Sequence, residues 1–122
     1  VSSYVSILNN CQYSLENHWK NAAHLIDDTK KAQEIEKALW SKSPEDVFDG
    51  VELQMLRYAE KLTLRPSDMV EADVTALKSV GADDGEILEL NQIIGYFNYV
   101  NRLLNGLGVN TSGDKVGFYK SD

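Results

Sequence analysis

The chain has 122 residues, a length at which a single domain can bury a hydrophobic core. Its 19 acidic and 12 basic residues give a net charge of −7, which repels phosphate backbones and anionic membrane surfaces, so nucleic acid is not an expected partner. The longest uncharged run, residues 1–15, is too short to span a bilayer, so no membrane association is expected. A single cysteine excludes an intrachain disulfide and favours a reducing compartment, by default the cytoplasm.

Apolar residues recur at intervals of three and four in six stretches, which predicts helices over residues 1–8, 11–25, 29–40, 51–64, 70–80 and 84 to about 106. No stretch shows the alternation of polar and apolar residues that is typical of a β-strand. Residues 113–122 are predicted to be a polar tail with Phe118 and Tyr119 as its apolar anchor. The chain is therefore predicted to be all-α, with one domain over residues 1–122.

Local signals mark where the later helices begin and end. Pro66 predicts the end of the fourth helix, because the residue before a proline is pushed out of helical geometry. Ser67 and Asp68 are the predicted caps of the fifth helix. Asp83 and Glu86 have the spacing of a capping box directly before the longest helix, which is the predicted core helix.

The only cysteine lies at the predicted start of the second helix. Cys11, Ser14 and His18 share one helical face, and Ala22 and Leu25 continue the stripe. The positive end of the helix dipole favours thiolate over thiol, which makes Cys11 a candidate nucleophile and His18 a candidate proton acceptor. The two lie about 10 Å apart along the helix axis, so Ser14 or a water must bridge them. We expect the three side chains on one face beside a cavity.

Other interpretations of these residues stay open. A lone cysteine is more often a small buried apolar residue than a nucleophile, and a histidine on a helix more often serves packing or faces solvent. A metal site is not expected. Cys11, His18 and His24 are three potential ligands, but His24 lies about 140° round the helix from Cys11 and about 120° from His18.

The longest predicted helix carries polar groups on an otherwise apolar pattern, namely Tyr96, Asn98, Tyr99, Asn101 and Arg102. These residues either line a pocket or a partner interface, or they form the wet face of an amphipathic helix. Their spacing alone leaves both interpretations open.

The sequence around Cys11 resembles the carboxymuconolactone decarboxylase and alkylhydroperoxidase D superfamily. The matching segment is residues 5–14 (VSILNNCQYS) followed by His18, where the peroxidase branch carries Cys-x-x-Cys-x-x-x-His. The likeness extends to residues 57–66, which begin RYAEKLT, to residues 73–77, and to residues 96–109, which begin YFNYVNR. The combination covers nearly the whole chain and points to the subgroup of peroxidase-related enzymes.

The resemblance implies an alkylhydroperoxidase D-like helical bundle that forms homo-oligomers, often trimers or hexamers. It also implies an antioxidant activity, the reduction of alkyl hydroperoxides by a redox-active cysteine, without a metal or other cofactor. An external thiol or thioredoxin-like protein would be the reductant. Carried over by residue, Cys11 matches the first cysteine of the motif and His18 matches the histidine of the proton relay.

Two features depart from the family pattern. Ser14 stands at the second cysteine position, so Cys11 has no resolving thiol in its own chain. If Ser14 is natural, Cys11 is expected to form a sulfenic acid or a mixed disulfide, as in a one-cysteine peroxidase; if Ser14 is engineered, the parent would be a two-cysteine enzyme. The relay glutamate of the family lies about three helical turns before the first cysteine, and this chain begins only ten residues before Cys11. We therefore expect that Val1 is not the natural N-terminus and that N-terminal helices precede it.

Two other functions remain as alternatives. The first is a non-catalytic helical oligomer of the same fold, in which Cys11 is inert. The second is a carboxymuconolactone decarboxylase-type enzyme, which would carry acid or base residues in its pocket in place of thiol chemistry.

Overall fold

The computed structural model describes residues 1–113 and 115–117, and this part of the chain contains helices and no strand. Six α-helices and two short 3-10 turns follow one another: α1 (Ser2–Leu8), α2 (Gln12–Ile26), α3 (Thr29–Trp40), η1 (Pro44–Asp46), α4 (Gly50–Leu64), η2 (Pro66–Asp68), α5 (Glu71–Ser79) and α6 (Asp84–Leu107). The all-α prediction is therefore confirmed for these residues. The predicted anchor of the tail, Phe118 and Tyr119, lies outside them.

The predicted capping box at the start of α6 is present. The Asp83 carboxylate accepts a hydrogen bond from the Glu86 backbone N–H (2.8 Å), and the Glu86 carboxylate accepts one from the Asp83 N–H (2.9 Å). The helix ends where Gly108 takes a left-handed conformation (φ 66°), which glycine adopts without a steric penalty. The sequence signals at both ends of α6 therefore define its length.

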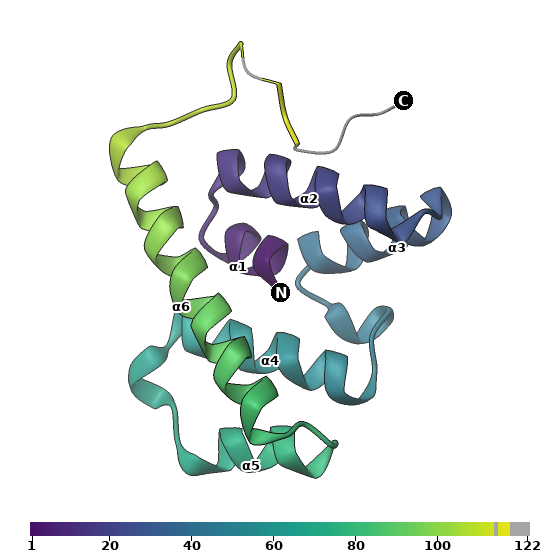
Figure 1. The fold of residues 1–122 in the computed structure, drawn as a ribbon, viewed down its shortest axis with the longest axis vertical. Coiled ribbons are helices and arrows are strands. Elements are labelled where there is room, and N and C mark those ends of the chain that lie inside the picture. The colour runs from purple at the N-terminus through teal and green to yellow at the C-terminus, as the bar shows by residue number, and fades with distance from the viewer. Residues whose placement is uncertain (114, 118–122) are drawn as a thin grey trace.

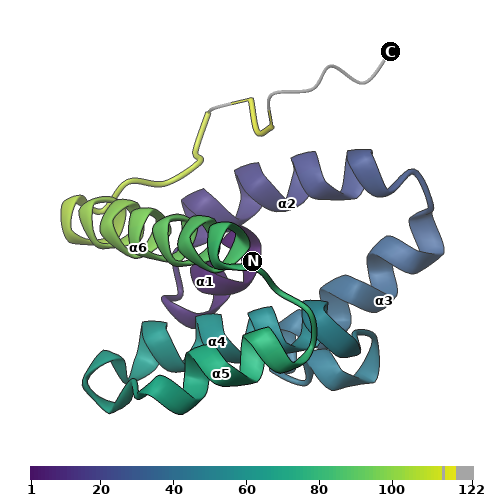
Figure 2. The ribbon, with the colours of Figure 1, turned by 60° about the horizontal axis from the view of Figure 1, so that its bottom comes forward.

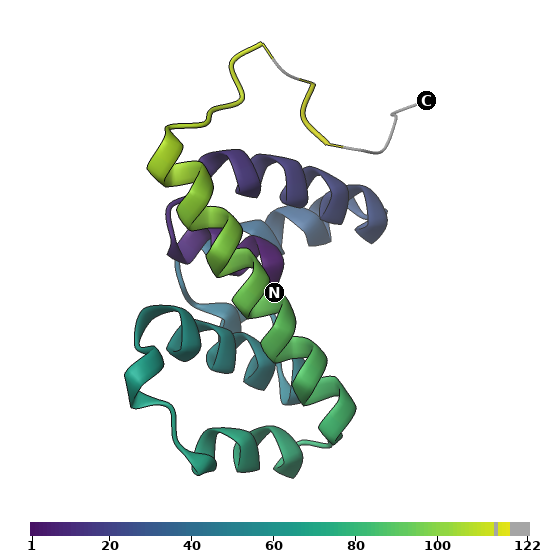
Figure 3. The same ribbon diagram turned by 60° about the vertical axis from the view of Figure 1, so that its left-hand side comes forward.

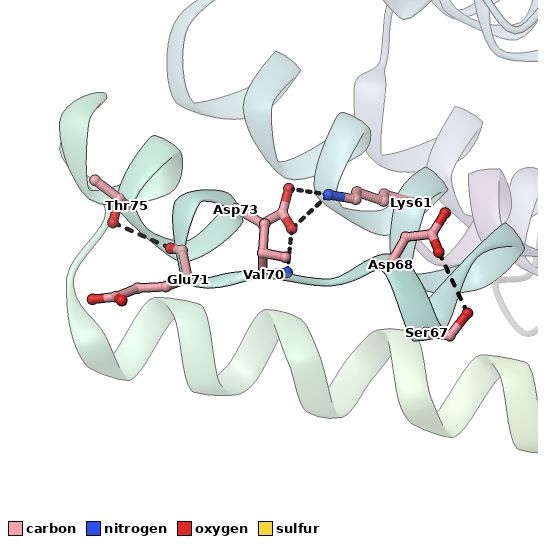
Figure 4. A network of polar contacts seen from close by, with 7 residues as sticks. All are labelled: Lys61, Ser67, Asp68, Val70, Glu71, Asp73 and Thr75. Atoms are coloured by element: carbon pink, nitrogen blue, oxygen red, sulfur yellow. Dashed lines mark hydrogen bonds and ion pairs between the residues drawn. The ribbon is translucent and has the colours of Figure 1, made fainter.

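The start of α5 differs from the prediction. Ser67 and Asp68 do not cap this helix, because both belong to the η2 turn that follows α4. The cap comes from inside the helix, where the Asp73 carboxylate accepts a hydrogen bond from the backbone N–H of Val70 (2.8 Å). The same carboxylate binds Lys61 Nζ through both of its oxygens, at 2.8 and 2.7 Å (Figure 4). One side chain therefore starts α5 and ties it to α4.

The short helix α1 lies at the centre of the fold, where it contacts α2, α3, α4 and α6 (Figures 1 and 2). A helix of seven residues is too short to be stable in isolation, so its stability comes from packing. Its residues 3–7 are all buried, and Tyr4 and Val5 have no exposed surface. The position of α1 determines where the segment after it, with Cys11, enters α2.

The buried apolar residues form two clusters that both include residues of α1. Val5 belongs to the cluster with α4, α5 and α6, whereas Tyr4 and Ile7 belong to the cluster with α2, α3 and α4. Complete burial of one such side chain contributes about 1.5–3 kcal/mol. The two clusters therefore hold α1 from opposite sides.

The longest helix, α6, has 24 residues and runs from the side of α5 to the start of α2 (Figures 1 and 3). Because it passes α1 and α4 on the way, it brings late residues of the chain beside the earliest ones. Within the described part of the chain, α6 and the other helices all lack the combination of length and apolar character that crossing a membrane requires.

Candidate functional site: the Cys11 cavity

Cys11 occupies the N-cap position of α2, between the end of α1 and the first turn of α2. Its backbone N–H donates to the Ser6 carbonyl (2.9 Å), and its own carbonyl accepts the first hydrogen bond of the helix from Leu15 (3.0 Å). The side chain is 1% exposed and borders a cavity of about 160 Å³. The cavity is lined by Ser6, Ile7, Asn10, Cys11, Gln12, Leu15, Glu16 and Trp40. In this respect Cys11 lies where the sequence predicted, at a helix start and beside a cavity.

The helix end next to Cys11 attracts negative charge. The first backbone N–H groups of α2 have no partner within the helix, and the first turn of α2 contains no acidic residue. One carboxylate nevertheless lines the cavity, that of Glu16. Hydrogen bonds from Thr111 Oγ1 and Gln12 Nε2, each 2.6 Å long, lower the pKa of Glu16 and keep it ionised. The cavity therefore combines a thiol, a largely apolar wall that includes Ile7, Leu15 and Trp40, and one fixed negative charge.

Ser14 is buried, with 2% of its surface exposed, but it does not line the cavity. Its hydroxyl lies 2.9 Å from the hydroxyl of Ser6, which also accepts a weaker hydrogen bond from Asn101 Nδ2 (3.4 Å). The Ser14 hydroxyl is thus bonded to α1, and within the described residues the structure places no hydrogen bond between it and Cys11 or His18. The second position of the motif is part of the packing between α1 and α2.

His18 is half-buried under α6 and does not line the cavity. Its ring packs edge-on against Phe97, with ring centroids 4.7 Å apart and an interplanar angle of 87°. Burial lowers the pKa of His18, because removal from water disfavours the imidazolium ion. The side chain is therefore neutral at neutral pH, the form that accepts a proton.

The predicted stripe on α2 is buried only at its beginning. Cys11 and Ser14 are almost fully buried, whereas Leu25 is 67% exposed. The difference follows from the position of α6, which lies over the start of α2 and not over its end (Figure 1). The covered part of the stripe comprises Cys11, Ser14 and His18.

A network of neutral side chains beside Ser14 was not expected from the sequence. Asn101 is fully buried on α6, and the amide of Asn9 donates to both Asn98 Oδ1 (3.0 Å) and Asn101 Oδ1 (3.1 Å). Asn98 in turn donates to Thr63 Oγ1 on α4 (3.1 Å). These bonds join the end of α1 to α4 and α6. They therefore position the segment that leads into Cys11.

The polar residues predicted on α6 fall into two groups, one that faces the interior and one that faces solvent. Asn98 and Asn101 face the interior and bind α1, whereas Tyr96 and Tyr99 are 61% and 62% exposed. The burial of Asn101 could have been predicted from the sequence, because it lies seven residues after Ile94, which is fully buried, and residues seven apart share a helical face.

In the described part of the chain, no group of three or more His, Cys, Asp or Glu residues is arranged to hold a metal ion.

Comparison with known proteins finds similarity among solved structures. No family model and no curated protein matches the chain. The fold is similar to the crystal structure of an uncharacterized peroxidase-related protein from Silicibacter sp. TM1040, with a TM-score of 0.79 and 26% sequence identity. The match covers 93% of this chain and 59% of the other, so the chain spans about three fifths of that protein's length. The fold of this chain is thus a helical bundle similar to that of a peroxidase-related protein.

Proposed function

We propose that the chain belongs to a thiol-dependent peroxidase of the alkylhydroperoxidase D-like group, in which Cys11 reduces hydroperoxides as part of antioxidant defence. The observation that carries the proposal is the position of Cys11, at the N-terminus of α2 and on the wall of a small cavity. The similarity to a peroxidase-related protein supports the same function. Neither the non-catalytic oligomer nor the decarboxylase-type enzyme has a comparable observation in its favour.

The proposed reaction uses the Cys11 thiolate as the nucleophile. Its sulfur attacks one peroxide oxygen, the O–O bond breaks, and the products are a sulfenic acid on Cys11 and an alkoxide that takes up a proton to become an alcohol. The helix N-terminus stabilises the negative charge of the attacking thiolate. Because liquid water occupies about 30 Å³ per molecule, a cavity of about 160 Å³ suits a hydroperoxide with few heavy atoms.

Within this proposal, His18 is the proton acceptor. It is neutral at neutral pH, so it can take the thiol proton and later return a proton to the alkoxide. Seven helical residues place it about 10 Å along the axis from Cys11, so the transfer runs through Ser14 or a water molecule. For Ser14 to take part, its hydroxyl must leave or share the bond with Ser6.

Regeneration of Cys11 requires partners outside the chain. With Ser14 at the second motif position, the sulfenic acid is resolved by an external thiol, which forms a mixed disulfide and releases water. A second thiol, or a thioredoxin-like protein, then reduces that disulfide and is itself oxidised. This requirement supports a location in the cytoplasm, where such thiols are kept reduced.

We further propose that the protein assembles as a trimer or hexamer. The second half of α6 exposes four large apolar residues: Tyr96, Tyr99, Leu103 and Leu107. Sedimentation of the native protein tests this proposal, with replacement of Tyr99 by Glu as the variant expected to lower the mass. A native protein that sediments only as a monomer would contradict it.

The decisive assay measures consumption of hydrogen peroxide and tert-butyl hydroperoxide with dithiothreitol as the regenerating thiol. The native protein is expected to consume both faster than buffer, and Cys11→Ser is expected to reduce consumption to the buffer rate. Ser79→Ala is the control, because it removes an exposed hydroxyl that does not line the Cys11 cavity, and it should keep the native rate. A native protein no faster than buffer, or a Cys11→Ser variant as fast as the native protein, would contradict the proposal.

A further inference from the structure

The carboxylate of Glu16 lies on the wall of the Cys11 cavity and is held there by two neutral donors. Gln12 Nε2 donates to one of its oxygens and Thr111 Oγ1 donates to the other, each over 2.6 Å. Gln12 precedes Glu16 by one turn of α2, whereas Thr111 belongs to the segment after α6. Contacts from two distant parts of the chain therefore fix both oxygens of the carboxylate.

The charge of Glu16 is not compensated by a basic side chain. In the part of the chain that the structure describes, no basic group lies within ion-pair distance of it. Lys20, one turn further along α2, is exposed, and its carbon chain lies beside Gly117. The hydrogen bonds to Glu16 come from neutral groups, so they keep the carboxylate ionised without cancelling its charge. A full negative charge therefore borders the space in which Cys11 reacts.

A neighbouring cavity of about 460 Å³ shares two wall residues, Asn10 and Gln12, with the Cys11 cavity. Thr111 also lines it. Because Gln12 and Thr111 both bind Glu16, the carboxylate lies at the boundary between the two cavities. Among the described residues that line either cavity, Glu16 alone is charged. A reactant that approaches Cys11 from the larger cavity passes this charge.

An uncompensated charge beside a confined reactive atom selects reactants by their own charge. An anion that enters the cavity is repelled, and it finds no basic group there to replace its hydration. A neutral reactant meets no such repulsion, and a cation is attracted. The N-terminus of α2 acts in the opposite direction, but its partial charge of about half an elementary charge is smaller than the full charge of Glu16.

We propose that Glu16 determines the charge selectivity of the Cys11 site. It admits neutral and positively charged hydroperoxides and thiols, and it discriminates against anionic ones, such as hydroperoxides that carry a carboxylate. The proposal rests on the proposed function for the identity of these reactants. The selectivity itself applies to any reagent that reaches the thiol, so it can be measured without peroxide.

Thiol modification tests the proposal at a single site, because Cys11 is the only cysteine of the chain. The probes are two methanethiosulfonates of similar size, one with a trimethylammonium group and one with a sulfonate group. The Cys11 thiolate attacks the divalent sulfur of the reagent, forms a mixed disulfide with it and displaces methanesulfinate. Intact-mass spectrometry follows each rate at low ionic strength, and each rate is divided by that of the same reagent with 2-mercaptoethanol.

The normalised rate of the cationic reagent should exceed that of the anionic one in the native protein. Glu16→Gln should lower this ratio about tenfold, because a unit charge several ångströms away changes each rate about threefold even at the dielectric constant of water. High salt should lower the native ratio without any substitution. Glu89→Gln is the matched control and should keep the native ratio, because it removes the same charge from an exposed position outside both cavities.

The proposal would be overturned by a native ratio at or below one, by a native ratio that salt leaves unchanged, by equal ratios in Glu16→Gln and the native protein, by an equal change in Glu89→Gln, or by a Cys11 that reacts with neither reagent. Peroxide consumption is a separate readout. Charge selectivity in a protein that consumes no peroxide would contradict the proposed function alone, and peroxide consumption without charge selectivity would contradict the role of Glu16 alone.

Discussion

Two cavities of this molecule, the one at Cys11 and the one beside α4, differ in size and in the residues that line them. The cavity at Cys11 is about 160 Å³, contains the only thiol of the chain and is lined by no basic residue. The cavity beside α4 is about 400 Å³, has four basic residues in its wall and is lined by no cysteine or histidine. The first therefore offers a reactive atom with little means of binding an anionic ligand. The second offers charged groups of both signs, four basic and three acidic, without a thiol or an imidazole.

The two regions are also held together by different forces. Around Cys11, neutral hydroxyl and amide groups bind one another, among them Ser6, Ser14 and Asn101. Beside α4, the polar contact between α4 and α5 is the ion pair of Lys61 with Asp73, in addition to apolar packing. Neutral hydrogen bonds respond little to pH and salt, whereas an ion pair responds to both. Stability measurements can therefore tell the two regions apart.

The largest change is expected from Ser14→Cys, which restores a second thiol three residues after Cys11. Peroxide should convert the native protein to a sulfenic acid or a mixed disulfide, but it should convert this variant to an intramolecular disulfide. Intact-mass spectrometry after thiol alkylation distinguishes these products. Finding both thiols free after treatment with peroxide would show that the motif is not redox-active in this fold.

Asn101→Ala is expected to destabilise the protein by about 3 kcal/mol, because it removes hydrogen bonds to Asn9 and to the buried Ser6 and opens a small cavity in the interior. Denaturant unfolding measures the loss, which should be similar at low and high salt. Asn105→Ala is the control, since this exposed residue also binds Asn9 and its removal should cost under about 1 kcal/mol. Equal losses in the two variants would contradict the importance assigned to the buried network.

A smaller loss, dependent on pH, is expected for Asp73→Asn. Hydrogen bonds from Lys61 and from the Val70 backbone lower the pKa of Asp73 in the folded protein. The unfolded chain therefore binds the proton first, so this stabilisation is present above about pH 4 and is lost as the pH falls toward the lowered pKa. The variant should be less stable than the native protein near pH 7, and the difference should shrink in acid and in high salt.

The control for this experiment is Asp68→Asn, because Asp68 lies in the neighbouring turn and its carboxylate makes only a 3.5 Å contact, with the Ser67 hydroxyl, among the described residues. This control removes a nearby carboxylate and leaves the ion pair of Lys61 with Asp73 in place. A difference between Asp73→Asn and the native protein that persists unchanged in acid would show that the ion pair is not its source.

The smallest effect on stability is expected from His18→Gln. Burial lowers its pKa in the folded protein, so on acidification the unfolded chain takes up the proton first, beginning near pH 6.5. Native stability should therefore decline as the pH falls through this region, and His18→Gln should reduce that slope. Thermal unfolding from pH 8 to pH 5 measures this slope, and a slope unchanged in His18→Gln would contradict the assignment.

Local signals in the sequence predicted the helices well because they act over a few residues. The capping box of Asp83 and Glu86 and the break at Pro66 operate within one turn, and both appear where expected. The caps predicted at Ser67 and Asp68 failed because that segment forms a 3-10 turn, and Asp73 supplies the cap from the other side. Competition between two local structures is not visible in spacing alone.

The candidate site could be predicted in part. The placement of Cys11 at a helix start follows from its neighbours in sequence, but the cavity beside it is lined by neither Ser14 nor His18, which were expected there. The bonds that position this segment join residues about 90 positions apart, such as Asn9 with Asn98 and Asn101, and no local pattern announces them. Packing between distant helices determines which polar groups meet, and this is why the amide network was not foreseen.

The central claim, that Cys11 is the redox centre, is tested most directly by trapping its sulfenic acid. Protein treated with one equivalent of hydrogen peroxide in the presence of dimedone, digested and examined by mass spectrometry, should carry the adduct on the Cys11 peptide, and pretreatment with an alkylating agent should abolish it. A Cys11 peptide that stays unmodified under these conditions, in protein shown to be folded, would contradict the account.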